Sequence, residues 1–178
     1  MSRKIVFGAL VIGALALGLY GLRPGGPLLI PEDPARAPAI TVAGARLVKH
    51  DTDGHKLWEL EARQIETFES ESLATDVTLS FFDKEDRQTL IVKAPQVRLE
   101  HRTGDMSLLG TIEATGEEFS FTTENLRWDA QKKLLYTEAA IQVMGTDFEL
   151  RGLGFEYSTE TARATIKHHA RLRFKEPR

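Results

Sequence analysis

The segment Thr123–Val143, TENLRWDAQKKLLYTEAAIQV, decides how this chain folds. Its first part alternates polar residues with Leu126 and Trp128, and the polar stretch 129–133 separates it from a second run that ends at Val143. Alternation with a period of two is typical of a β-strand that buries one face. The segment is therefore predicted to form two antiparallel strands joined by a turn.

The same pattern recurs along the chain at a fixed interval. APQVRLE at 94–100 and GLGFEYS at 152–158 align with TENLRWD at 123–129, so the steps from 94 to 123 and from 123 to 152 are both 29 residues. A weaker copy begins at Ala62, 32 residues before Ala94. A regular repeat indicates supersecondary units that share one core, whereas the alternative is a chance register of β patterns.

Strand-like segments continue through the rest of the chain, and no helical periodicity of comparable length follows Leu22. We expect strands at 41–49, 56–65, 73–82, 88–99, 106–115, 118–128, 133–144, 147–157 and 162–174. Hairpin connections make the sheet antiparallel. The prediction is an all-β domain, a sandwich or jelly roll, with one continuous interior and an open edge at each end.

One face of these strands is apolar, and the other is rich in Glu, Lys, Arg and Thr. The residues expected to point inward are Trp58, Leu60, Val77, Leu79, Phe81, Leu90, Val92, Val97, Leu99, Leu108, Ile112, Phe119, Phe121, Leu126, Trp128, Ile141, Val143, Phe148, Leu150, Phe155, Tyr157, Ile166, Leu172 and Phe174.

The N-terminal region differs from the rest. Arg3 and Lys4 precede Ile5–Leu22, a stretch of 18 residues without charge, ten of which are Ile, Val, Leu or Phe. As a helix it would span roughly 27 Å, close to the thickness of a bilayer's hydrocarbon core. A cleavable signal peptide is the alternative, but its apolar segment is usually shorter and no small-x-small site follows directly. We expect a retained transmembrane helix at 5–22 after a cytoplasmic tip at 1–4.

A proline-rich linker, 23–39, follows the predicted helix, and its five prolines favour a semi-extended spacer. The domain at 40–178 then lies across the membrane from the tip, which in a bacterium is the periplasm. Within the helix, Gly13 belongs to a small-residue stripe with Ala9 and Ala16. This stripe could pack against another membrane helix, or it could be the ordinary Gly and Ala content of a single-span anchor.

Composition and motifs give no support for catalysis. The net charge of −3 offers no argument for nucleic-acid binding, and the absence of cysteine removes thiolate chemistry. No HExxH, GxSxG, P-loop or GxGxxG motif is present, so no catalytic residue and no cofactor is predicted. His50 and His55 flank a turn and could meet a metal, but a solvated turn is the simpler interpretation, and no metal site is predicted.

The C-terminal region is basic. Its cationic residues are Arg163, Lys167, Arg171, Arg173, Lys175 and Arg178. They could attract phosphates or anionic lipid. Alternatively, they are charges that protect an edge strand from unwanted pairing.

The layout of a basic tip, one membrane anchor and β repeats of about 29 residues resembles the LptC family, the bitopic inner-membrane component of lipopolysaccharide export. The segments that carry the resemblance are WELEA at 58–62, TLSFFDK at 78–84 before VKA at 92–94, LGTIEA at 109–114, FTTENL at 121–126 and GTDF at 145–148. The periplasmic sister protein shares the repeat without an anchor, so the predicted anchor favours LptC. The linker and the basic tail match no family feature.

The resemblance implies a twisted, boat-shaped β-jelly roll with an open V-shaped interior. It implies a non-enzymatic protein that accepts lipopolysaccharide from the inner-membrane ABC transporter and passes it, edge to edge, to the soluble LptA-type bridge protein. Ile5, Gly13 and Leu22 would belong to an anchor beside the transporter helices, and Gly145 would be the important glycine of a Gly-Thr-x-Phe turn.

An apolar trough that does not close could hold acyl chains, because each buried CH₂ contributes about 0.8 kcal/mol. The residues expected to line it are Trp58, Leu60, Leu79, Phe81, Val92, Leu99, Phe121, Leu126, Trp128, Val143, Phe148, Phe155 and Tyr157. The alternative for each is plain core packing. Two other functions remain open at this point: a membrane-tethered adaptor that recruits a protein by sheet-edge pairing without binding lipid, and a sugar hydrolase, which would need a carboxylate pair in a cleft.

Overall fold

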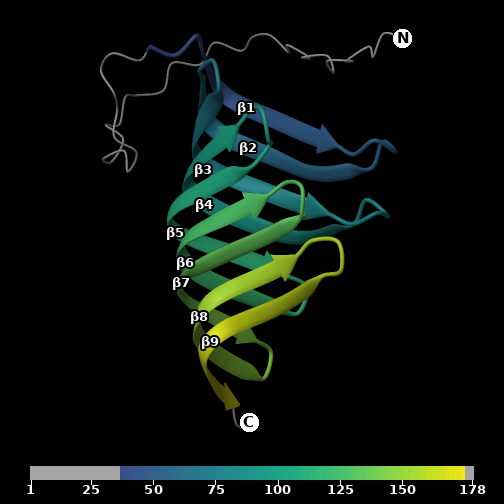
Figure 1. Cartoon of the computed structure of the whole chain (residues 1–178), viewed down its shortest axis with the longest axis vertical. Helices are drawn as coiled ribbons and strands as arrows, with labels where there is room; N and C mark the ends of the chain where they lie inside the picture. The colour runs from purple at the N-terminus through teal and green to yellow at the C-terminus, as the bar shows by residue number, and fades with distance from the viewer. Residues whose placement is uncertain (1–36, 175–178) are drawn as a thin grey trace.

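The computed structural model describes residues 37–174, which form one sheet of nine antiparallel strands in sequence order (Figure 1). The strands are β1 (Ile40–His50), β2 (Lys56–Thr67), β3 (Glu71–Phe82), β4 (Gln88–Glu100), β5 (Met106–Gly116), β6 (Phe119–Asp129), β7 (Leu134–Gly145), β8 (Phe148–Ser158) and β9 (Arg163–Phe174). Every predicted strand is present, and each boundary lies within two residues of its predicted position.

The predicted tip, the predicted anchor with Ile5, Gly13 and Leu22, and the linker up to residue 36 lie outside the described residues, as do Lys175 and Arg178. Residues 37–174 contain no helix that is long and apolar enough to span a bilayer.

The strand order is simpler than that of a sandwich with crossing connections. Each strand pairs with its sequence neighbours, so the sheet is a continuous meander from β1 to β9. Successive hairpins close in tight turns, and the outer strands β1 and β9 each leave one edge without a partner strand in the described residues. The local twist of each pair accumulates along this series, as Figure 1 shows.

The facing pattern changes near the middle of β2, β3, β4 and β6, whereas β5 and β7 alternate throughout. In β2 the buried positions are Leu60, Ala62 and then Ile65, and in β6 the step from Thr123 to Leu126 is likewise three residues instead of two. Such a step rotates the strand, so that both of its halves direct side chains to the same interior. We call this line across the sheet the crease.

The crease follows the sequence repeat. Pairing is irregular between Lys93 and Gln96 in β4, between Thr123 and Arg127 in β6, and between Arg151 and Leu153 in β8. These irregularities lie at or beside positions 94, 123 and 152, where the three copies of the repeat begin. Each 29-residue unit is therefore one hairpin with a bend at an equivalent place.

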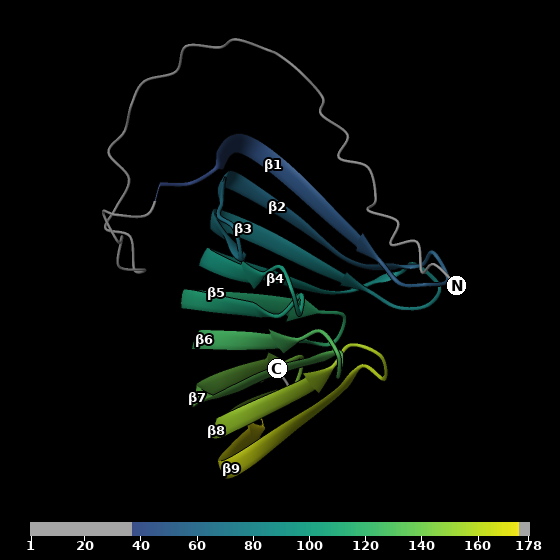
Figure 2. The same ribbon diagram turned by 45° about the horizontal axis from the view of Figure 1, so that its top comes forward.

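The bends roll the sheet over its own apolar face. Adjacent strands are about 4.8 Å apart, so β3 and β6 would lie about 14 Å apart in a flat sheet. The ring centroids of Phe81 in β3 and Trp128 in β6 are nevertheless only 4.8 Å apart. Figure 2 shows the turns at one end of β1–β4 approaching the β8–β9 turn, while the other ends of these strands diverge.

Candidate functional site

The apolar interior is the first candidate site. Of the thirteen residues predicted to line it, eleven are buried and two, Leu99 and Phe148, are partly buried against the same core. The buried ones are Trp58, Leu60, Leu79, Phe81, Val92, Phe121, Leu126, Trp128, Val143, Phe155 and Tyr157. The structure thus brings the whole predicted set together on one face.

Aromatic contacts connect strands that are distant in the sheet. Phe121 in β6 lies 4.7 Å from Phe155 in β8, and Phe119 lies 5.8 Å from Tyr157, measured between ring centroids. Tyr157 in β8 also hydrogen-bonds the Thr89 side chain in β4, and burial raises the pKa of its hydroxyl. Such tilted pairs add about 0.5–1.5 kcal/mol each beyond burial, so they hold the rolled sheet together.

Two polar atoms inside the fold are left without a hydrogen-bond partner in the described residues. They are the indole Nε1 of Trp128 and the side-chain Oε1 of Gln96. An unsatisfied buried group typically costs about 1–3 kcal/mol. The indole N–H is therefore a free donor within an otherwise apolar surface.

The apolar lining is not covered equally along the sheet. Leu150 pairs with Leu172, and Phe148 pairs with Phe174, on the inward face of β8 and β9. Leu172 is 49% exposed and Phe174 is 71% exposed. At the opposite edge, Ile40 is 57% exposed in β1. The interior therefore reaches solvent at both edge strands, and at β9 it does so through two large side chains.

Gly145 ends β7 in the turn before Phe148. The ring of Phe148 covers the glycine, and a Cβ added at position 145 would lie 2.5 Å from the ring Cζ. At Gly116, one repeat earlier, an added Cβ would lie 3.3 Å from the nearest ring atom of Phe119. The same turn thus occurs twice, with the closer aromatic cover at Gly145.

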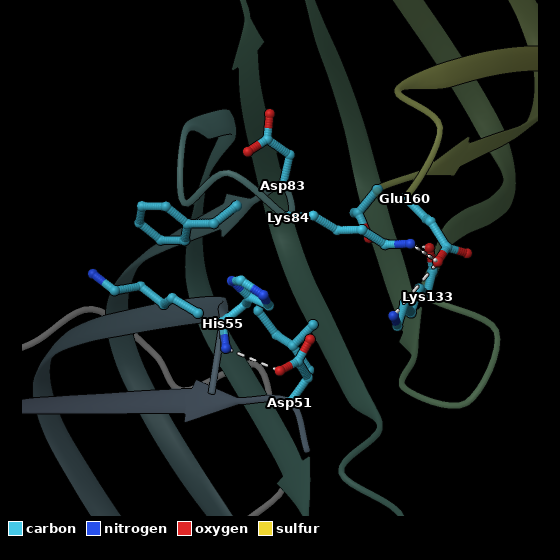
Figure 3. A pocket seen from close by; sticks show the side chains of 10 residues that line it. Asp51, His55, Asp83, Lys84, Lys133 and Glu160 are labelled. Carbon is cyan, nitrogen blue, oxygen red and sulfur yellow. Dashed lines mark hydrogen bonds and ion pairs between the residues drawn. The ribbon is translucent and has the colours of Figure 1, made fainter. Parts of the chain in front are cut away.

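The meeting of the turns creates a second candidate, a small cavity of about 20 Å³ (Figure 3). Lys84 and Lys133 lie 3.6 and 3.7 Å from Glu160, which joins the β3–β4, β6–β7 and β8–β9 turns. Thr159 N–H donates to the carbonyl of Lys133 at 3.1 Å. Because the cavity has room for about one water molecule, this cluster links the turns and is not a ligand pocket.

The carboxylates of these turns interact with groups of the same turn. The backbone N–H of Arg87, and then its guanidinium, lower the pKa of the Asp83 carboxyl. In the β1–β2 turn, His55 donates its backbone N–H to Asp51.

Residues 37–174 contain no group of three His, Asp or Glu arranged to hold a metal ion.

The prediction from sequence missed part of the core. Met106 and Leu135 are fully buried, and Gln96 and Thr137 are buried polar residues beside the crease. Leu134-Leu135 could be read in either phase, since both residues are apolar. Met106 and Thr137 continue the alternation of Leu108 and Ile141, so the pattern could have identified them, whereas at Gln96 the phase changes between the inward residues Val92 and Val97.

Comparisons with known proteins agree with this architecture. The family model described as "Lipopolysaccharide-assembly, LptC-related" matches residues 9–175. A solved structure with a similar fold is LptH from Pseudomonas aeruginosa, described as the LptA-homologous periplasmic component of the lipopolysaccharide transport device. The TM-score is 0.52 at 8% identity, with 67% of this chain and 95% of that chain covered, so this likeness concerns the fold alone.

A comparison with curated protein sequences gives no match. The family match covers nearly the whole chain, including all nine strands, and the resemblance expected from the repeats is confirmed. The chain belongs to the LptC-related family of lipopolysaccharide-assembly proteins.

Proposed function

We propose that this chain is a membrane-anchored, non-enzymatic carrier that accepts lipopolysaccharide from the inner-membrane ABC transporter and passes it to a periplasmic LptA-type bridge protein. Membership of the LptC-related family supports a role in lipopolysaccharide transport. The predicted helix at 5–22 would anchor the chain in the inner membrane, and the described sheet would lie in the periplasm.

The observation that carries the proposal is the apolar lining that continues to the outer edge of β9, which has no partner strand in residues 37–174. The row formed by Val143, Leu150 and Leu172 crosses β7, β8 and β9, and its exposure rises from 7% at Val143 to 49% at Leu172. Large apolar groups exposed to water beside an unpaired strand edge are unfavourable in a monomer and are typical of an interaction site. A second apolar sheet added at β9 would cover them and extend the trough.

The chain order gives the trough a direction. The predicted anchor precedes β1, so the β1 edge, with Ile40 and Val42 exposed, would face the transporter. The β9 edge would then face the bridge protein. Lipid would move from β1 toward β9 across successive hairpins.

Acyl chains would have to separate side chains that already contact each other in order to enter the interior. The interior is filled by aromatic pairs such as Phe81–Trp128, whose centroids are 4.8 Å apart. Chain burial contributes about 0.8 kcal/mol per CH₂, so one or two methylene groups would offset the loss of one such pair, which is worth about 0.5–1.5 kcal/mol. The unpartnered Trp128 N–H could donate to an ester or hydroxyl oxygen of the lipid.

Site-specific photocrosslinking during ATP turnover tests this proposal. Photoreactive residues at Phe81, Trp128 or Phe155 should capture lipopolysaccharide, and a residue at Arg127, which points outward from β6, is the matched control. Capture at Arg127 without capture at the inward positions would contradict the proposal.

The packed interior also favours a second candidate, a tethered adaptor that pairs with a protein through its sheet edge and binds no lipid. Purification in mild detergent separates the two. Co-purifying lipopolysaccharide supports the carrier, whereas a stable complex with the bridge protein that contains no lipid supports the adaptor.

A further inference from the structure

The outward face of β9 carries positive charge that the described part of the protein does not neutralise. Arg171 and Arg173 alternate with the inward residues Leu172 and Phe174, Arg163 begins the same strand, and all three arginines are exposed. Within residues 37–174, none of these three arginines has an ion-pair partner.

The neighbouring strand β8 adds positive charge beside these arginines and does not neutralise them. Arg171 lies directly opposite Arg151 in the β8–β9 register, and Glu149, opposite Arg173, is already bound by Arg151 at 2.6 Å. Lys167 differs, because Glu138 and Glu156 hold it at 3.0 and 2.8 Å. The unneutralised charge is thus concentrated at Arg171 and Arg173, beside the exposed apolar pair of the same strand.

A second copy of this chain is a poor complement for this face. Antiparallel pairing of β9 with β9 would bring arginines near arginines, which is destabilising across strands. Pairing of β9 with β1 would offer Thr41, Ala43, Arg46 and Val48 on the corresponding face, and Arg46 is the one charged residue among them. Neither arrangement supplies a carboxylate from the paired strand.

We propose that the strand which adds to β9 belongs to the bridge protein and carries Asp or Glu at alternating positions, opposite Arg171 and Arg173. This inference rests on the proposed handover at β9 and adds the chemistry that selects the partner. Residues two apart on a strand share a face, so one acidic pair at i and i+2 matches both guanidinium groups while the inward side chains extend the apolar lining.

The charges also favour a protein strand over the lipid headgroup. Arg171 and Arg173 point away from the interior face on which Leu172 and Phe174 lie. A lipid whose chains occupy the interior would have its phosphates at the rim of that face. A paired strand, in contrast, places its outward side chains about 5 Å from those of β9.

Binding measurements on the full-length chain in detergent micelles test the inference, with the purified periplasmic bridge protein as the ligand. The double variant R171E/R173E should weaken binding about tenfold or more at low salt, mainly through slower association. Raising the salt from about 0.05 to about 0.5 M should weaken binding of the unmodified chain and strengthen binding of the variant, because salt screens the repulsion between its glutamates and the acidic residues of the partner strand.

The matched control is K49E/R127E. These residues are exposed on β1 and β6, away from the β9 edge, and have no ion-pair partner in residues 37–174, so the net charge changes equally. The control should bind like the unmodified chain. R171K/R173K should also retain most binding, which separates loss of charge from loss of folding. Unchanged affinity of R171E/R173E would overturn the inference.

A crosslinking arm distinguishes this inference from the proposed handover. Since the chain has no cysteine, Leu172→Cys can be paired with single cysteines introduced along the bridge protein. Crosslinking together with normal binding by R171E/R173E leaves the handover in place and refutes the charge match. No crosslinking at Leu172 in the otherwise unmodified chain refutes the handover itself.

If R171E/R173E loses binding only to vesicles of anionic phospholipid, the face belongs to the membrane and the inference is wrong.

Discussion

At the scale of single residues, Gly145 shows how a turn depends on the absence of a side chain. Gly145→Ala should lower the free energy of unfolding by about 1–3 kcal/mol, because the new Cβ would push the Phe148 ring out of its place beside the core. Urea unfolding measures the change.

The preceding repeat provides the control for this prediction. Gly116→Ala places a Cβ 3.3 Å from the Phe119 ring, a contact that a small shift relieves, so its cost should be smaller. Equal costs at both glycines would show that aromatic cover is not the reason for glycine at 145.

At the scale of the strand, the crease depends on residues that accept unusual backbone angles. Gly154 in β8 has φ +72°, and a Cβ there would lie 3.1 Å from Cβ of Lys167, whose ammonium crosses β8 to reach Glu138 in β7. Gly154→Ala should cost about 1–2 kcal/mol for the left-handed angle, plus the displacement of Lys167.

Gly44 separates these two contributions. It lies in β1 with φ +63° and has no atom within 4 Å of an added Cβ, so Gly44→Ala reports the backbone cost alone. The free energy of unfolding should fall further for Gly154→Ala than for Gly44→Ala. The reverse order would mean that Lys167 does not need the space above Gly154.

At the scale of the whole molecule, the rolled sheet should unfold as one unit and not repeat by repeat. In a linear stack of repeats, damage at one end remains local. Here Tyr157 in β8 contacts Phe119 in β6 and Thr89 in β4. Truncating a buried aromatic residue costs about 3–5 kcal/mol. Tyr157→Ala should therefore speed amide hydrogen exchange in β4–β6 as well as in β7–β9.

Leu153→Ala is the comparison for that experiment, since Leu153 lies in the same strand and is 41% exposed. It should leave exchange in β4–β6 unchanged. Faster exchange that stays within β7–β9 for Tyr157→Ala would show that the hairpins are energetically independent.

The sequence by itself determined the nine strands, the 29-residue unit and the face on which residues such as Leu60, Leu79 and Phe121 lie. These features are local: the pleat of a strand alternates side chains, and polar turns end it. The interior set was predictable for the same reason. Alternation did not predict which inward residues are buried and which are exposed, because the exposed Leu172 and the buried Phe155 follow the same pattern.

Only the tertiary structure decided that the strands form one meandering sheet, where it bends, and that its last two inward side chains remain exposed at β9. The closure joins residues such as Phe81 and Trp128, whose contact depends on the summed twist of the intervening strands and on the irregular pairing between them. Alternation in a single strand carries no information about that sum, so the roll and the open β9 edge follow from the packing of the whole sheet.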